Sequence, residues 1–244
     1  WHRKECFDPM EIATLTNVSK TYRMGEVEVT ALENVSLAVP RGGFTALVGP
    51  SGSGKTTALN LMGCLDRPSS GEVTVDGQSV GRLDRRRGAD FRGRALGFIF
   101  QDFNLLPVLS VHENVEYPLL MIRDLPKSER KPAVERVLEA VGMADQADKY
   151  PAQLSGGQKQ RVAVARALVA DPVLVLADEP TANLDGDTAR RVMALMKRMR
   201  DERGVTFVFS THDSRVMDQA ETTFRLEDGR LVDRNETGTE GRRG

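Results

Sequence analysis

A glycine-rich stretch in the first quarter of the chain constrains the fold more than any other feature. Residues 49–57 read GPSGSGKTT and fit the pattern G-x-x-x-x-G-K-[ST], in which backbone N–H groups wrap the phosphates of a nucleotide. The apolar run Phe44–Val48 precedes it, and an apolar pattern with helical spacing begins at Ala58. The stretch therefore predicts a strand, a phosphate-binding loop and a helix in succession.

Three short apolar runs are typical of strands buried on both faces, as in the centre of a parallel sheet. They are Phe44–Val48, Val173–Ala177 and Val205–Ser210. The glycine-rich loop follows the first run, Asp178 and Glu179 follow the second, and His212 follows the third. Open α/β sheets bind ligands at the carboxyl ends of their strands. The sequence therefore predicts an α/β fold that gathers these residues at one edge of a mostly parallel sheet.

Two kinds of periodicity predict the surrounding elements. Short apolar and alternating runs predict further strands, including a small N-terminal antiparallel layer, and Asp228-Gly229 marks a hairpin. These strands are expected at residues 11–18, 29–39, 71–76, 97–100, 223–226 and 231–233. Apolar residues three and four apart predict helices over 134–141, 159–170 and 192–199. We interpret Met196 and Met199 of the last pattern as core residues rather than as a metal site.

Composition excludes several classes of protein. With 34 basic and 35 acidic residues, the net charge of −1 favours neither nucleic acid nor an anionic membrane as a partner. The apolar runs fall far below the roughly 18 residues of a membrane-spanning helix. Cys6 and Cys64 form no disulfide framework, so we expect a reducing cytoplasm. We interpret residues 1–9 as a tag or disordered extension and 235–244 as a disordered tail, which leaves 10–234 as the folded domain.

A basic segment, residues 82–94, holds six arginines and invites a nucleic-acid interpretation. Asp84 and Asp90 dilute its charge, and Phe91 is its only aromatic residue. We therefore interpret the segment as a solvated helix face and expect no nucleic-acid partner.

Each position of the glycine-rich loop has a chemical role. Its glycines let the backbone turn sharply and bring amides onto the phosphates, at a helix N-terminus that adds positive potential. Lys55 can reach the β- and γ-phosphates, and the Thr56 hydroxyl can ligate Mg²⁺. We expect nucleotide contacts from the whole loop: Gly49, Pro50, Ser51, Gly52, Ser53, Gly54, Lys55, Thr56 and Thr57.

Two carboxylates end the second apolar run. We expect Asp178 to hold Mg²⁺, directly or through water, and Glu179 to orient or deprotonate the attacking water. Phosphoryl transfer depends mostly on positioning and on charge stabilisation, so these roles need the geometry of a shared site.

A second phosphate-type sequence, LSGGQ at residues 154–158, opens the predicted helix 159–170. It offers the Ser155 hydroxyl and glycine amides at a helix N-terminus, which makes a second anion site. With this motif the chain, over about residues 11–233, resembles the nucleotide-binding ATPase subunits of ABC transporters. The resemblance implies ATP and Mg²⁺ as ligands. It also implies that four signature residues act in trans on the ATP held by a partner subunit: Ser155, Gly156, Gly157 and Gln158.

Further motifs of that family follow in order. Gln101 matches the glutamine that senses Mg²⁺ and the γ-phosphate, and His212 matches the histidine that contacts the γ-phosphate. Residues 182–185 match the loop that crosses the dimer interface, and Tyr22 matches the aromatic residue that stacks on adenine. The resemblance implies a P-loop NTPase core, an N-terminal antiparallel β layer and an inserted α-helical subdomain over about 101–158.

The resemblance also implies partners. We expect a second ATPase subunit in a homodimer and separate integral membrane permease subunits, so that this chain is peripheral to the cytoplasmic face of a bacterial inner membrane. Residues 60–71 and 103–107 resemble the lipoprotein-releasing, macrolide-efflux and antimicrobial-peptide-export ATPases. Two alternatives stay open: a regulatory ATPase of the division-associated type that drives no transport, and a soluble ATPase of DNA repair or translation.

Overall fold

The computed structural model describes residues 10–25, 27–123 and 125–236. The predicted extension at 1–9 and the tail from 237 onward lie outside these residues. Asn235 and Glu236 were predicted to begin the tail, and this is wrong, because they continue the last strand, β10 (Arg230–Glu236), and pair with Thr223 and Thr222 of its neighbour.

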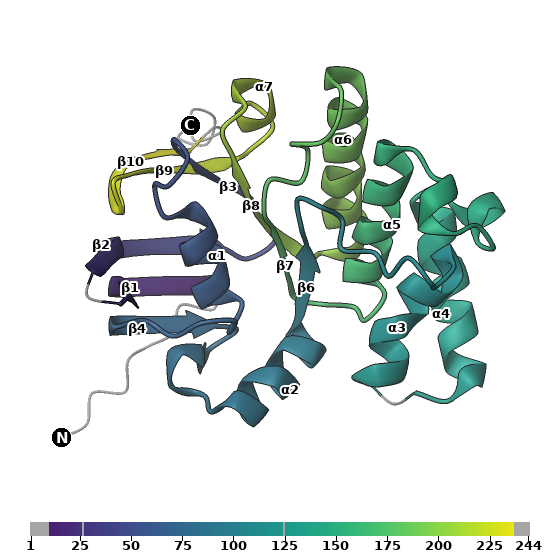
Figure 1. The fold of residues 1–244 in the computed structure, drawn as a ribbon, viewed down its shortest axis with the longest axis horizontal. Coiled ribbons are helices and arrows are strands. Elements are labelled where there is room, and N and C mark those ends of the chain that lie inside the picture. Colours follow the sequence, from purple (N-terminus) through teal and green to yellow (C-terminus); the bar gives the residue numbers. More distant parts are fainter. Residues whose placement is uncertain (1–9, 26, 124, 237–244) are drawn as a thin grey trace, which may run out of the picture.

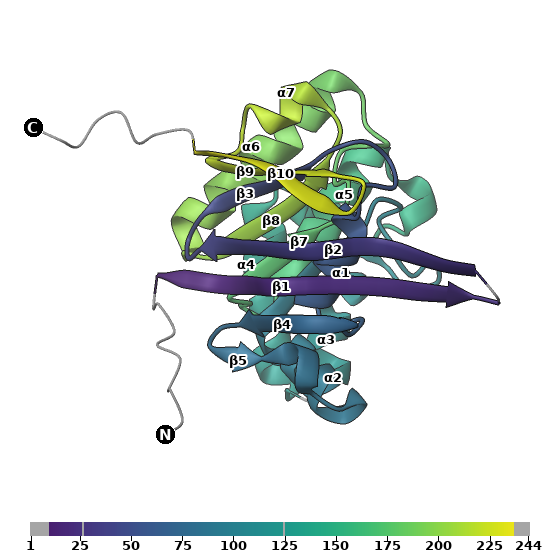
Figure 2. The ribbon, with the colours of Figure 1, turned by 90° about the vertical axis from the view of Figure 1, so that its left-hand side faces the viewer.

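An antiparallel sheet of four strands forms one layer, in the order β2-β1-β4-β5. Its strands are β1 (Glu11–Met24), β2 (Val27–Pro40), β4 (Ser70–Val75) and β5 (Gln78–Ser79). The first two form one long hairpin that extends well beyond the other strands (Figure 2). The predicted runs 11–18 and 29–39 are too short, because they omit residues 19–24 of β1 and residues 27, 28 and 40 of β2. Val27 and Glu28 are exposed and so lack the alternation of a half-buried strand.

A six-stranded sheet forms the second layer, in the order β10-β9-β3-β8-β7-β6. Its strands are β3 (Phe44–Val48), β6 (Leu96–Ile99), β7 (Leu174–Ala177), β8 (Thr206–Thr211), β9 (Thr222–Glu227) and β10. All neighbours pair in parallel except β9 and β10, whose hairpin turns at Asp228-Gly229 as predicted. The strands predicted for this sheet are confirmed to within one residue at either end, except that the predicted run 231–233 ends three residues before β10 does.

Helix α1 (Lys55–Met62) lies between the two sheets (Figure 1). Its apolar residues share one core with β1, β2 and β4 and with one face of the central sheet, for example Leu47 and Val208. The other face of that sheet, which includes Phe44 and Phe207, is covered by helices and forms a second core. The loop before α1 therefore joins two elements, β3 and α1, that are both anchored in the core.

The remaining helices lie mostly on that second face (Figure 1). They are α2 (Arg85–Ala95), α3 (Val111–Met121), α4 (Lys127–Ala140), α5 (Gly156–Leu168), α6 (Gly186–Arg203) and α7 (Ser214–Met217). The helix predicted over 192–199 lies within α6, and those predicted over 134–141 and 159–170 correspond to α4 and α5 but run one and two residues past their ends. None of the helices within the described residues has the length and apolar character needed to cross a membrane.

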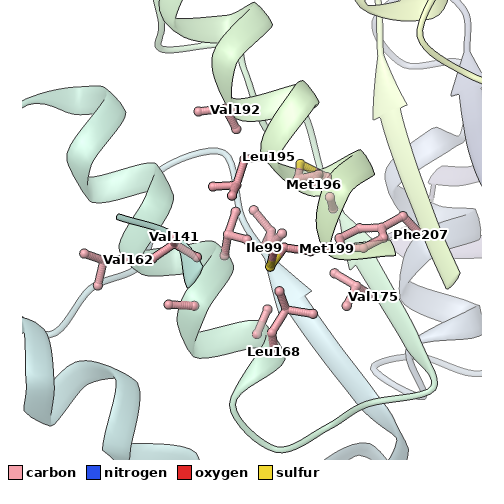
Figure 3. Packing of buried hydrophobic residues seen from close by; sticks show 14 of the residues in the cluster. Ile99, Val141, Val162, Leu168, Val175, Val192, Leu195, Met196, Met199 and Phe207 are labelled. Atoms are coloured by element: carbon pink, nitrogen blue, oxygen red, sulfur yellow. The ribbon is translucent and has the colours of Figure 1, made fainter. Parts of the chain in front are cut away.

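The methionine stripe of α6 belongs to the core, as predicted. Met196 and Met199 are fully buried and pack with Val175 and Phe207 of the sheet (Figure 3). The arginines of α2 behave differently, because most are exposed while Arg92 is half-buried. The interpretation of that segment as a solvated helix face is therefore confirmed.

Candidate active site

A cavity of about 590 Å³ lies where the chain leaves the carboxyl ends of β3, β7 and β8. Its lining brings together most of the residues predicted for nucleotide chemistry. They are Pro50, Ser51, Gly52, Ser53, Gly54, Lys55, Thr56, Thr57, Gln101, Asp178, Glu179 and His212, with Ala31 beside them. Parallel strands present their carboxyl ends at one edge of the sheet, which is why positions so far apart in sequence meet.

The glycine-rich loop has the conformation that its glycines predict. Gly49, Gly52 and Gly54 have φ angles of 146°, 80° and 100°, in the region that side chains disfavour. A Cβ on Gly54 would come within 2.5 Å of the Ala31 carbonyl oxygen, so backbone packing also requires glycine there. Gly54 is the N-cap of α1 and supplies no capping side chain. The first amides of α1 are therefore not capped by a side chain of the N-cap residue.

Lys55 is largely buried at the floor of the cavity. Its ammonium donates to the carbonyl oxygens of Gly49, at 2.9 Å, and Pro50, at 2.8 Å. A buried ammonium needs such acceptors. These bonds hold the charge inside the curve of the loop, where it can meet an anionic ligand.

Thr56 and Asp178, two of the predicted metal ligands, are in direct contact. The Thr56 hydroxyl lies 3.0 Å and 3.1 Å from the two carboxylate oxygens of Asp178. Magnesium binds oxygen atoms and usually takes one or two carboxylates together with substrate phosphates and water. A hydroxyl and a carboxylate that already adjoin beside the phosphate loop fit that preference.

Glu179 and His212 form a second pair across the cavity. Nδ1 of His212 lies 2.9 Å from Oε1 of Glu179. The Glu179 side chain is 16 % exposed, whereas that of His212 is 65 % exposed. Glu179 has a φ of 46°, which places it in the left-handed region directly after β7. This backbone turn lets consecutive carboxylates meet different partners, Thr56 for Asp178 and His212 for Glu179.

Sequence reasoning assigned no role to Ser210, which the structure places between the acidic residues. Its hydroxyl lies 2.6 Å from Oδ1 of Asp178 and 2.8 Å from the backbone nitrogen of Glu179. Ser210 is fully buried in β8. The available signal was a serine at the end of an otherwise apolar run, two residues before His212 of the predicted site.

Gln101 lines the cavity and begins a loop that leads to α3. The Asn183 side chain donates to its carbonyl oxygen at 3.0 Å and to Oδ1 of Asp102 at 3.2 Å. Further along, Arg166 of α5 donates to the carbonyl oxygens of Phe103 and Asn104, both of which have positive φ. Sequence reasoning missed these attachments, because each joins residues more than sixty positions apart.

Tyr22 is absent from the described lining of the cavity. Its hydroxyl donates to Oδ2 of Asp66 at 2.8 Å, and the Lys20 ammonium lies 4.7 Å from the centre of its ring. Burial and the bond to Asp66 raise the pKa of Tyr22. Burial opposes ionisation of Asp66, but hydrogen bonds from Lys20, the Arg67 N–H and Tyr22 hold its pKa below the usual value. The predicted adenine contact stays a prediction.

Three of the signature residues, Ser155, Gly157 and Gln158, line a different cavity, of about 870 Å³, between the end of α4, the start of α5 and α6. Ser155 caps α5 by accepting from the Gln158 N–H at 3.3 Å, while Oε1 of Gln158 accepts from the Ser155 N–H at 2.9 Å. No described residue lines both this cavity and the P-loop cavity. One chain therefore holds the two predicted phosphate sites apart.

Comparison with known proteins places this geometry in context. Residues 32–182 match the family model described as ABC transporter. The chain is 46% identical to the lipoprotein-releasing system ATP-binding protein LolD of Bordetella pertussis, over 88% of this chain and 93% of that protein. It is also 46% identical to the macrolide export ATP-binding/permease protein MacB of Syntrophobacter fumaroxidans, over 90% of this chain but 31% of that protein.

Among solved structures, the chain resembles the ATP-binding cassette MJ0796 of Methanocaldococcus jannaschii, described as a dimer in a post-hydrolysis state bound to ADP and Pi. The TM-score is 0.85 at 42% sequence identity, and the match covers 92% of this chain and 98% of that one.

Proposed function

This chain belongs to the ABC transporter family, and from that premise we propose that its P-loop cavity binds ATP with Mg²⁺ and hydrolyses it to power a membrane permease. The single observation that carries the proposal is the convergence at one cavity of a phosphate-binding loop, a hydroxyl–carboxylate pair and a carboxylate–imidazole pair. Each of these has a separate task in phosphoryl transfer.

The loop binds the phosphates of ATP. Its amides and the N-terminus of α1 offer donors and positive potential, and Lys55 adds a full charge. When the nucleotide binds, the Lys55 ammonium exchanges loop carbonyl oxygens for phosphate oxygens. Charge-assisted bonds to phosphate are stronger than bonds to neutral carbonyls. Tyr22 would stack on adenine at the outer end of the nucleotide.

Thr56, Asp178 and Gln101 would hold Mg²⁺ at the inner end of the nucleotide. Bound there, Mg²⁺ would supply positive charge that offsets the negative charge developing on the phosphates during transfer. Glu179 orients the attacking water and accepts its proton, while His212 holds the Glu179 carboxylate and faces the γ-phosphate.

The separate cavities support a composite site. A P-loop and a signature that lie apart in one chain can meet on one nucleotide only if a second chain supplies one of them. We therefore propose that two copies close around two ATP molecules, each signature covering the partner's γ-phosphate. The dimeric description of MJ0796 supports this arrangement.

An apolar surface near α3 supports a permease contact. Large apolar side chains are exposed along α3 and the loop before it: Leu106, Val108, Tyr117, Leu120, Met121 and Ile122. Exposed apolar clusters of this kind mark interaction sites. We propose that permease subunits of the lipoprotein-release or efflux type contact it, with this chain peripheral to the cytoplasmic face of the membrane.

Phosphate release by the purified chain tests the enzymatic part of the proposal. We expect ATP hydrolysis that requires Mg²⁺ and stops with EDTA, and an ATP-dependent dimer in size-exclusion chromatography. A chain that binds ATP without releasing phosphate under any Mg²⁺ concentration would contradict the proposal.

Co-purification with the membrane subunit tests the permease contact. Replacing Met121 by Asp should reduce recovery of the permease, because a charge would then be buried in an apolar contact, while the basal ATPase rate stays unchanged. Lys131→Asp on the exposed face of α4 is the matched control and should leave recovery intact. Equal recovery with both variants would contradict the contact.

A further inference from the structure

We infer that Ser210 is a positioning residue that holds both acidic groups of the site, Asp178 and Glu179, in their working geometry. The inference rests on the proposed function and adds to it a residue that none of the family motifs includes. Ser210 is fully buried, and its hydroxyl is the only side-chain group among the described hydrogen bonds that contacts both acidic residues.

The directions of the two bonds follow from chemistry. An ionised carboxylate can only accept, so the Ser210 hydroxyl donates its proton to Oδ1 of Asp178 over 2.6 Å. A backbone N–H can only donate, so the Glu179 nitrogen donates to the same hydroxyl oxygen over 2.8 Å. One hydroxyl is thus used as a donor and as an acceptor, and it links two consecutive residues.

The strand register explains why the hydroxyl lies there. The ladder between β7 and β8 ends with Ala177 opposite Phe209, so Ser210 is one step beyond the last pair. Side chains alternate along a strand, which places Ser210 on the face of Val208 and Asp178 on the face of Leu176. Both faces border the core that contains α1. The Ser210 side chain therefore bonds to Asp178 and Glu179 just beyond the last backbone pair between β7 and β8.

The backbone of Glu179 needs this support. Its φ of 46° lies in a region that residues other than glycine adopt only at a cost. The turn is what directs its carboxylate to His212 rather than along β7. By accepting a hydrogen bond from the Glu179 N–H, Ser210 stabilises the turn. It also pairs a backbone donor that lies beyond the end of the β7–β8 ladder.

Asp178 is held from two sides, and only one of these contacts comes from a residue that would also ligate Mg²⁺. Thr56 bonds the carboxylate through its hydroxyl proton, while the lone pairs of the same oxygen would be the ones that bind the ion. Ser210 lies on β8, whereas Thr56 lies on α1, and Ser210 keeps its bond to Asp178 when the ion binds. It therefore acts as an outer partner that orients a metal-binding carboxylate.

The test compares Ser210→Ala with a matched control, Thr206→Val. Thr206 is also fully buried on β8, and its hydroxyl accepts one backbone N–H, that of Gly42, at the opposite end of the strand. Both changes remove a buried hydroxyl from the same strand. Only the first removes a contact with the acidic residues.

The main measurement is the affinity of the ADP-bound protein for Mn²⁺, followed by the magnetic resonance signal of free Mn²⁺. For Ser210→Ala we expect affinity and kcat to fall by about ten- to a hundred-fold, as for other outer partners of metal ligands. ADP affinity in EDTA should stay at the wild-type value, since the P-loop is untouched. Thr206→Val should lower thermal stability but leave Mn²⁺ affinity and kcat unchanged. Ser210→Thr, which keeps a hydroxyl, should retain the Mn²⁺ affinity that Ser210→Ala loses.

The outcomes separate this inference from the proposed function. Wild-type protein that shows neither Mn²⁺ binding nor Mg²⁺-dependent hydrolysis would overturn the proposed function itself. Wild-type protein that shows both, with Ser210→Ala matching it in Mn²⁺ affinity, would overturn only the role of Ser210. If Ser210→Ala does not fold, Ser210→Cys, which keeps the volume but donates weakly, carries the same expectation.

Discussion

Two helices of this protein begin at glycine-rich phosphate motifs, and their N-termini are built differently. Helix α1 begins after Gly54, which has a φ of 100° and supplies no side-chain cap. Helix α5 begins after Ser155, whose hydroxyl and whose N–H are both bonded to Gln158. The first N-terminus has no side-chain cap from its N-cap residue, whereas the second is already capped by its own chain.

This difference separates a site that can bind alone from one that depends on a partner. The P-loop cavity is lined by the loop, Lys55 and the acidic residues of one chain. The Ser155 hydroxyl accepts the capping bond and keeps a proton that it could donate to a phosphate, but within its own chain it lies in another cavity. We therefore expect the two motifs to respond differently to substitution.

The largest effect should come from Glu179→Gln, which removes the proton acceptor and leaves the P-loop intact. We expect turnover to fall by about a hundred- to ten-thousand-fold, the usual contribution of general base catalysis. ATP should then trap a stable dimer. Phosphate release and size-exclusion chromatography measure both, with Glu135→Gln on the exposed face of α4 as the control. Turnover at the wild-type rate would contradict the assigned role.

Ser155→Arg should stop hydrolysis without removing ATP binding. A bulky cation at the start of α5 blocks closure over the partner's nucleotide, and loss of such transition-state donors costs about a hundred- to a thousand-fold. ATP affinity should stay near the wild-type value, because Ser155 lies outside the P-loop cavity. Titration with a fluorescent nucleotide measures the affinity, and phosphate release measures the hydrolysis rate. An equal loss of affinity would show that the signature does not act in trans.

Lys55→Ala should also stop hydrolysis, but with a loss of ATP affinity of about ten- to a hundred-fold, because a charge-assisted bond to phosphate is removed. Mixing this variant with Ser155→Arg sharpens the comparison. One composite site of the mixed dimer then has an intact P-loop and an intact signature, so hydrolysis should return. If the mixture stays as inactive as its components, the two motifs do not complete each other across the dimer.

The smallest effect should come from Ser155→Ala in the absence of nucleotide. Removing an N-cap serine costs about 0.5–2 kcal/mol of the free energy of unfolding. Urea denaturation measures the loss. Ser110→Ala removes the capping serine of α3, which has the same reciprocal bonds with Glu113, and should cost a similar amount. Unchanged stability in Ser155→Ala alone would show that α5 is not capped in the free chain.

Sequence reasoning located the strands and the cavity residues because both follow from local pattern. The β3 strand is an uninterrupted apolar run, and the loop after it has glycines at each position of positive φ. Asp178, Glu179 and His212 follow strands of the same sheet, so a parallel topology brings them together. Their proximity was predicted without knowledge of any distance.

Contacts between distant elements were beyond that reasoning. Tyr22 bonds to Asp66 rather than lining the described cavity, and Arg166 holds a loop some sixty residues earlier in the chain. Ser210 appeared to be one more residue of a buried strand. Each case depends on register or on helix packing, for which periodicity contains no information.

The sequence by itself determined the chemistry of this protein: which residues can hold phosphate, which can bind a metal ion and which can accept a proton. These follow from residue types at fixed spacing, and such spacing acts over a few positions of the chain. Tertiary structure alone decided that the P-loop and the signature face different cavities, and that Ser210 links the two acidic residues. The physical reason is that cavities and side-chain bonds depend on how layers pack, and packing joins residues that no local pattern relates.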